Sequence, residues 1–307
     1  AIQDLCFADH KLALLSGPRQ CGKTTLGKMF LRQRSVGEYK NWDEVEFRRQ
    51  WVKEPRSLIP VAKSGGVPML VLDEIHKDRR WKRTLKGMYD TLEHPCDILV
   101  TGSARLNVYS KGSDSLLGRY FHFRLHPFSL REMRSEESMP PDQVIENIFS
   151  RSLRRSKANE NKLKALMHFG PFPEPLFAQN EQKARLWRRT RSEIIIREDL
   201  RDISRIPELG RIEMMVSLLP PRVGGLFGLA SLREDMEVSF DTINRWLTYL
   251  KELYYLYELK PFSQKIHRSL KREGKMYFWD WSEVPDHAAR FENLVAGHLL
   301  KACHFWT

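Results

Sequence analysis

The sequence predicts an α/β protein whose first half forms a parallel sheet flanked by helices and whose second half is mainly helical. Three short apolar runs, at residues 12–15, 69–72 and 98–100, are continuous, as in strands buried on both faces of a parallel sheet. Each run leads into glycine, hydroxyl or acidic residues, which are typical of ligand sites at the carboxyl ends of such strands. The pair Pro140-Pro141 then marks a break, after which apolar residues recur at helical spacing.

Composition limits the classes of function. The 307 residues allow two or three domains, and 41% hydrophobic with 29% charged residues is ordinary for a globular protein. A net charge of +12 favours a polyanionic partner, although a basic surface without a partner is equally compatible. No apolar stretch approaches the ~20 residues of a membrane span, and the first residues do not resemble a signal peptide, so we expect a cytoplasmic protein. The missing initiator Met suggests a fragment.

The four cysteines show no paired spacing, so neither a zinc site nor a disulfide framework is expected.

The first apolar run enters a glycine-rich loop, Gly17–Thr25, and then a helical pattern. The loop matches G-x-x-x-x-G-K-[ST], in which backbone N–H groups and the helix N-terminus surround phosphates. We expect Lys23 to reach the β- and γ-phosphates of ATP and the Thr24 hydroxyl to bind Mg²⁺. The residues expected to contact the nucleotide are Gly17, Pro18, Arg19, Gln20, Cys21, Gly22, Lys23, Thr24 and Thr25.

Two acidic residues, Asp73 and Glu74, follow the second run. Asp73 is predicted to hold Mg²⁺ and Glu74 to act as general base on the attacking water. Both could instead simply cap the next helix. The glycine-rich loop makes the catalytic interpretation the stronger one.

Polar residues after the later strands are further catalytic candidates. Ser103 follows the third run and is predicted to sense the γ-phosphate, with Thr101 as the alternative; a helix cap would also explain a serine there. Arg119 precedes an alternating strand at 120–125 and is a candidate arginine finger that acts on a neighbouring subunit. Arg105 is a second candidate, and a structural arginine is nearly as compatible.

These motifs together resemble the bacterial and archaeal AAA-type ATPases whose C-terminal part is a domain of unknown function. The matching residues are GPRQCGKTT at 17–25, NWD at 41–43, LVLDEIHK at 70–77, LVTGSARL at 99–106, LLGRYF at 116–121, HPFS at 126–129, FPEP at 172–175, the stretch 231–259 and FENLVAGHLLK at 291–301. The resemblance covers nearly the whole chain.

The resemblance implies an AAA-like P-loop NTPase core at 1–135, a helical lid at 136–205, a winged helix at 206–282 and the start of a restriction-endonuclease-like domain at 283–307. Pro171 departs from the family pattern, which has a second glycine before FPEP. The chain stops at Thr307, before the acidic strand and lysine that such a nuclease needs, so no nuclease role is carried over.

The second half combines a basic helix with a helix-turn-helix pattern. Residues 181–201 form a long helix rich in arginine, one of which could contact nucleotide while most are expected to be solvated or paired. Helices at 230–236 and 240–253, followed by two strand-like segments around a basic loop, predict a winged helix. Double-stranded DNA binding and a protein-binding role are both open. The candidate DNA contacts are Thr242, Asn244, Arg245, Lys265, Arg268, Lys271 and Arg272.

The sequence therefore predicts an ATPase that hydrolyses ATP to ADP with Mg²⁺ and moves its lid and winged helix, with DNA as the expected partner and a homo-oligomer as the expected assembly. The alternative is a slow nucleotide-gated switch or scaffold that controls a protein partner. Phosphoryl transfer to a small molecule is disfavoured, because the Asp73–Glu74 pair suits water as the acceptor.

Overall fold

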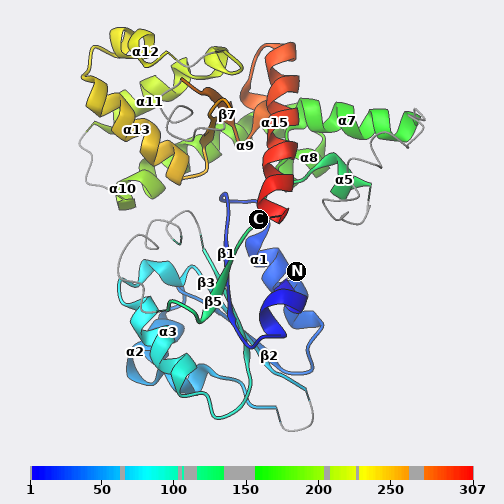
Figure 1. Ribbon diagram of the computed structural model, residues 1–307, viewed down its shortest axis with the longest axis vertical. Coiled ribbons are helices and arrows are strands. Elements are labelled where there is room, and N and C mark those ends of the chain that lie inside the picture. The colour runs from blue at the N-terminus through cyan, green and yellow to red at the C-terminus, as the bar shows by residue number, and fades with distance from the viewer. Residues whose placement is uncertain are drawn as a thin grey trace. The chain divides into compact units, whose positions relative to one another are not determined.

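The computed structural model describes residues 2–62, 66–102, 106, 116–134, 156–203, 208–225, 228–262 and 273–306. The chain divides into two compact units, Ala1–Leu125 and His126–Thr307 (Figure 1). Each unit is described by itself below.

The first unit is built on a five-stranded, wholly parallel sheet with strand order β2-β3-β4-β1-β5. Its strands are β1 (Leu12–Ser16), β2 (Gly37–Asn41), β3 (Met69–Asp73), β4 (Asp97–Thr101) and β5 (Tyr120–Arg124). The three central strands are buried at every position, which is why their sequences are nearly continuous apolar runs. The predicted parallel α/β core is confirmed. Strand β2 was not predicted, because the sequence Gly-Glu-Tyr-Lys-Asn of this half-exposed edge strand carries almost no apolar signal.

Helices cover both faces of this sheet (Figure 1). One face packs against α1 (Lys23–Arg32) and the N-terminal turn η1 (Ile2–Phe7), through a core that includes Ala13, Leu15 and Val71. The other face packs against α2 (Val45–Lys53), η2 (Pro55–Leu58) and α3 (Trp81–Asp90), whose aromatic residues Phe47, Trp51 and Trp81 meet Leu12, Leu14, Leu70 and Leu72.

Strand register sets where the site can form. Asn41 lies beside Asp73, and Asp73 lies beside Thr101. Thr101 in turn lies beside Leu15, one residue before β1 ends. The carboxyl ends of β2, β3, β4 and β1 therefore meet at one edge of the sheet, as in ligand-binding α/β folds.

The second unit is mainly helical. Its N-terminal helices are α5 (Leu130–Met133), α7 (Lys157–Phe169) and α8 (Pro173–Ala178). A continuous helical run follows, made of α9 (Glu181–Ile194), η5 (Ile195–Asp199) and α10 (Leu200–Ile203). The unit ends with η7 (Trp281–Glu283) and the long helix α15 (His287–Trp306).

A winged-helix arrangement lies within this unit. It consists of α11 (Leu209–Leu218), the turn η6 (Pro220–Arg222), α12 (Leu229–Met236), α13 (Phe240–Glu252) and the antiparallel strands β6 (Leu256–Leu259) and β7 (Lys275–Phe278). Helix α13 begins at Ser239, whose hydroxyl accepts from the Thr242 N–H. Its buried residues Ile243, Trp246, Leu247 and Leu250 are the ones that helical spacing predicts.

A buried arginine distinguishes α9 from the solvated helix that its sequence suggests. Arg191 is 1% exposed, and its guanidinium lies 4.2 Å from the Phe172 ring and 5.6 Å from the Trp187 ring. It pairs with Glu283 at 3.4 Å. Burial, together with the charge of Asp280, raises the pKa of Glu283 to about 7. An arginine stacked on aromatic rings and paired with a carboxylate is a structural group of this core.

Candidate active site

The glycine-rich loop joins β1 to α1 at the carboxyl edge of the sheet. Gly22, the residue before α1, has φ 103°, a left-handed conformation that favours glycine. Lys23 is 7% exposed, and its Nζ donates to the carbonyls of Gly17 at 3.0 Å and Pro18 at 2.7 Å. The ammonium group is therefore held within the curl of the loop, beside the N-terminus of α1, where phosphates bind in loops of this kind.

The other loop residues predicted to contact the nucleotide differ in exposure and position. Pro18 is buried, Arg19 is half-buried, and Gln20 is exposed with φ 63°. Cys21 is buried, and its thiol lies 3.7 Å from the Leu125 carbonyl. Thr25 lies in the first turn of α1.

The two predicted metal ligands lie together. The Thr24 hydroxyl donates to Asp73 Oδ2 at 2.7 Å, which joins the loop to the end of β3. Asp73 is 2% exposed, and Oδ1 accepts from the Thr101 hydroxyl. One hydroxyl and one carboxylate are hard oxygen donors that suit Mg²⁺.

Among the described residues, no group of three or more His, Cys, Asp or Glu side chains could hold a metal by itself. The Thr24 hydroxyl and the Asp73 carboxylate could supply two oxygen ligands to a magnesium ion whose shell is completed by phosphate oxygens and water.

Glu74 has an unusual backbone at this edge. Its φ of 59° is left-handed, and its N–H donates to the Thr101 carbonyl at 3.0 Å. Burial raises the pKa of the Glu74 carboxyl, and the nearby Lys23 ammonium offsets part of that shift. A carboxylate poised in this way has the character of a general base.

Two residues that sequence reasoning missed complete this network. The Tyr39 hydroxyl, on β2, donates to Asp73 Oδ2 at 2.6 Å, and its burial together with this bond raises the pKa of Tyr39. His76 is 2% exposed, and its Nε2 lies 3.5 Å from Glu74 Oε2. A β-carbon added to Gly102 would lie 2.5 Å from His76 Nδ1, so the glycine allows the ring to approach. The only sequence signal was the nearness of His76 to the acidic pair.

The remaining catalytic candidates do not all join this site. Ser103 and Arg105 lie outside the described residues. Thr101, the alternative to Ser103, contacts Asp73 instead.

Arg119 lies just before β5 begins, at the opposite edge of the sheet from the loop, and pairs with Asp90 at 2.6 Å. A strand of five residues separates the two edges by roughly 16 Å, so Arg119 does not lie at the glycine-rich loop of its own chain. Arg124, by contrast, ends β5 beside Ser16 at the loop edge.

The candidate DNA contacts are partly visible. Arg245 is exposed on α13, whereas Thr242 and Asn244 are half-buried. Lys265, Arg268, Lys271 and Arg272 lie outside the described residues. Residues 229–252, which hold α12 and α13, carry three basic and five acidic side chains, whereas residues 260–275 carry six basic and one acidic. The positive charge of this module is therefore in its wing sequence.

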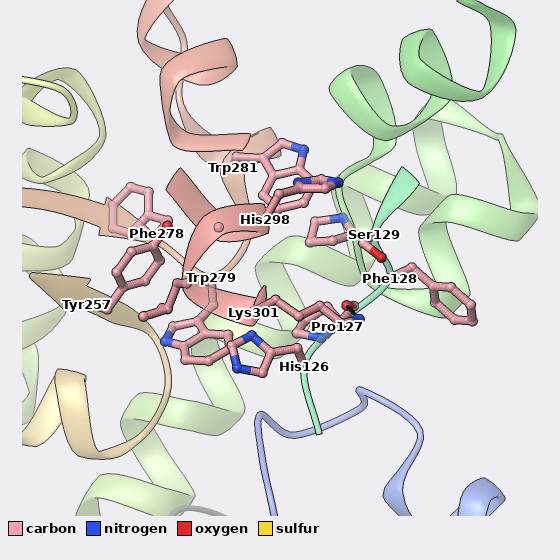
Figure 2. Close-up of a pocket in the computed structure, with 13 residues that line it drawn as sticks. His126, Pro127, Phe128, Ser129, Tyr257, Phe278, Trp279, Trp281, His298 and Lys301 are labelled. Carbon is pink, nitrogen blue, oxygen red and sulfur yellow. Dashed lines mark hydrogen bonds between the residues drawn. The ribbon is translucent and has the colours of Figure 1, made fainter. Parts of the chain in front are cut away.

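A pocket in the second unit is not a second nucleotide site. Figure 2 shows it lined by His126, Trp279, Trp281 and their neighbours. Its volume of about 20 Å³ leaves room for about one water molecule. In the part of the chain that the structure describes, no helix is both long and apolar enough to cross a bilayer.

Comparison with known proteins supports the core assignment. A family model described as "AAA domain" matches residues 9–134, and one described as "Domain of unknown function (DUF8612)" matches residues 160–285. AAA domains are nucleotide-binding P-loop domains, which agrees with the loop geometry above.

The similar curated proteins are distant. An uncharacterized protein of Mycobacterium tuberculosis is 24% identical over 270 residues, which are 88% of this chain and 54% of that protein. An uncharacterized protein of Methanocaldococcus jannaschii is 25% identical over 85% of this chain and 60% of its own length, and one of Haemophilus influenzae is 20% identical over 94% and 74%. The chain thus spans about half the length of the mycobacterial relative.

Among solved structures, the Aeropyrum pernix ORC1 protein in complex with DNA aligns with a TM-score of 0.34 and 14% identity, over 95% of this chain and 88% of that one. Drosophila ORC bound to AT-rich DNA and Cdc6 aligns with a TM-score of 0.28 and 10% identity, over 94% and 87%.

Proposed function

We propose that this chain binds Mg²⁺–ATP and hydrolyses it to ADP and phosphate. The observation that carries the proposal is the meeting of two sequence-distant segments. The loop brings the buried Lys23 amine and Thr24, and the end of β3 brings Asp73 and Glu74, with a Thr24–Asp73 hydrogen bond of 2.7 Å joining them. ATP hydrolysis requires a nucleotide-binding loop, ligands for one Mg²⁺ ion and a general base, and these residues supply all three at one edge of the sheet.

Each side chain has a distinct task in this proposal. Lys23 and the loop N–H groups bind the β- and γ-phosphates and neutralise their charge. Thr24 and Asp73 hold Mg²⁺, which supplies charge stabilisation to the phosphates when bound. Glu74 accepts a proton from a water aligned with the γ-phosphate, the water oxygen bonds to phosphorus, and the bond to the ADP oxygen breaks. Ser103 is proposed to sense the γ-phosphate.

The proposed output of the cycle is movement of the helical segments and the winged helix, acting on double-stranded DNA. The winged-helix topology, the basic wing sequence and the net charge of +12 support DNA as the partner. A homo-oligomer is proposed because Arg119, if it is an arginine finger, is placed to act on the nucleotide of a neighbouring subunit.

A slow nucleotide-gated switch that controls a protein partner is the second candidate. The acidic balance of α12 and α13 favours it, because the four carboxylates on these helices and Glu237 in the turn between them would repel DNA phosphates. The two candidates differ in whether DNA changes the rate of ATP hydrolysis.

The test measures ATP hydrolysis and Mg²⁺–ATP affinity of the full chain, with and without duplex or single-stranded DNA. We expect Glu74→Gln to lower kcat at least about 100-fold and to leave ATP affinity within about twofold. Lys23→Ala should lose affinity for Mg²⁺–ATP. Glu93→Gln, which replaces an exposed carboxylate, is the control and should behave as wild type. Absent ATP affinity would overturn the ATPase proposal; hydrolysis unaffected by DNA would favour the switch.

A further inference from the structure

Helix α3 presents a strongly basic face away from the sheet. It buries Trp81, Leu85 and Met88, at the i, i+4, i+7 spacing of one helix face. The turn before it and its outer side carry cations at complementary positions: Arg79, Arg80, Lys82, Arg83 and Lys86. We call these five residues the α3 basic face. Residues 77–90 hold six basic and two acidic side chains.

In the part of the chain that the structure describes, the three arginines of the α3 basic face have no carboxylate partner. Within the described residues, no acidic oxygen lies within 4.0 Å of the guanidinium groups of Arg79, Arg80 or Arg83. The two acidic residues of the segment are engaged elsewhere. Asp78 accepts from Trp51 Nε1 at 3.0 Å, and Asp90 pairs with Arg119 at 2.6 Å and with Lys86 at 3.6 Å.

This distribution of charge opposes the stability of the helix. Like charges at i, i+3 and i, i+4 within the helix, such as Arg83 with Lys86 and Lys82 with Lys86, repel one another. Cations in the first turn also oppose the helix dipole, which favours acidic residues there. Local folding would be served better by carboxylates at these positions, so the charge of the three arginines, Arg79, Arg80 and Arg83, calls for an external partner.

We propose that the α3 basic face binds the phosphate backbone of nucleic acid. The inference rests on the proposed action on DNA. It places a DNA contact on α3 of the first unit rather than on α13. Three forked guanidinium groups match phosphate oxygens bidentately. Residues 79–90 are all described, and no large apolar side chain is exposed among them, so the face lacks the apolar anchors that usually accompany arginine at the centre of a protein interface.

Backbone contacts of this kind are independent of sequence. The α3 basic face also begins five residues after Glu74, through the turn η3 (Ile75–Lys77). Nucleic acid bound there contacts the same strand–helix connection that carries the proposed base, which gives DNA a short route to the hydrolysis rate.

The experiment measures binding of a fluorescent 30-bp duplex to the full chain by anisotropy between about 25 and 200 mM salt. Arg79→Ala/Arg83→Ala is compared with Arg185→Ala/Arg189→Ala, a matched pair at the same spacing on α9. The control arginines have carboxylate partners, Glu181 at 3.6 Å and Glu193 at 3.1 Å. ATP affinity and thermal unfolding check that both variants are folded.

We expect the α3 variant to lose at least roughly tenfold in affinity at 0.1 M salt and to reduce the slope of log K against log salt by about 2. The control should stay within about twofold of wild type.

Three results would overturn the inference. Unchanged binding by the α3 variant, with loss only in Lys265→Ala/Arg268→Ala, would assign DNA to the wing and leave the proposed function standing. Failure of wild type to bind duplex at low salt would remove DNA from both proposals, while ATP hydrolysis would still be measurable. Displacement by poly-glutamate as effective as by DNA would indicate an acidic protein partner.

Discussion

Glu74 combines a left-handed backbone with a half-buried carboxylate. A non-glycine residue in this region costs on the order of 1 kcal/mol or more and persists only where its surroundings hold it. Here the hydrogen bond from its N–H to Thr101 holds it. The strained turn directs the side chain toward the loop edge, where the Lys23 charge acts on it. Strain at this position fits a role in catalysis rather than in stability.

His76 is predicted to orient Glu74. We expect His76→Leu to lower kcat for ATP by roughly 10- to 100-fold, because the carboxylate loses the ring nitrogen 3.5 Å away that restricts its direction. The affinity for Mg²⁺–ATP, measured by titration, should change by less than about twofold. His76→Gln, which keeps a donor, should recover part of the rate, and His94→Leu on an exposed loop is the control. Equal loss of affinity and rate would indicate a purely structural histidine.

Arg119 is predicted to act in trans. We expect Arg119→Ala to abolish hydrolysis with ATP affinity nearly intact, because the arginine lies too far from its own loop to touch the nucleotide bound there. Mixing Arg119→Ala chains with Glu74→Gln chains should restore part of the activity through mixed interfaces. Asp90→Ala, which frees the arginine but keeps it, is the matched control. Unchanged turnover in Arg119→Ala would make it a structural partner of Asp90.

At the scale of elements, the packing of α13 can be tested by a substitution on its buried face. We expect Trp246→Ala to destabilise the protein by about 3–5 kcal/mol, because the ring is 1% exposed and its removal leaves a cavity against Ile243 and Leu250. Arg245→Ala, on the exposed side of the same turn, should change stability by less than about 0.5 kcal/mol. Denaturant unfolding measures both. A small effect of Trp246→Ala would mean that α13 packs differently.

Elements with a strong local pattern were predictable, and those defined by long-range pairing were not. The loop, β1, β3 and the buried face of α13 each carry their signal within a few residues. Strand β2 exists because it pairs with β3, and Tyr39 reaches Asp73 only through that pairing. Arg191 likewise lies in a run of arginines, and only the packing of Phe172 and Glu283 around it shows that it is buried.

At the scale of the molecule, stability should depend on pH through Glu283. Its pKa is raised from 4.5 to about 7 in the folded protein, so between these values the folded state binds more protons than the unfolded state. The stabilising contribution is complete below pH 4.5 and is lost as pH rises through 7. We expect the melting temperature to fall across this window and Glu283→Gln to flatten that dependence, measured by calorimetry. Glu193→Gln, on the surface of α9, should keep the wild-type slope.

The order of strands in the sheet has a consequence during protein synthesis. β1 pairs with β4 and β5, and Ala13 meets Leu99 and Phe121, which follow it by 86 and 108 residues. At about 5–20 residues per second, the ribosome needs roughly 5–20 s to deliver the second partner. Both edges of this apolar strand are unpaired until β4 emerges, and one edge stays unpaired until β5 follows. Nascent chains of this protein should therefore depend on holding chaperones until β5 emerges.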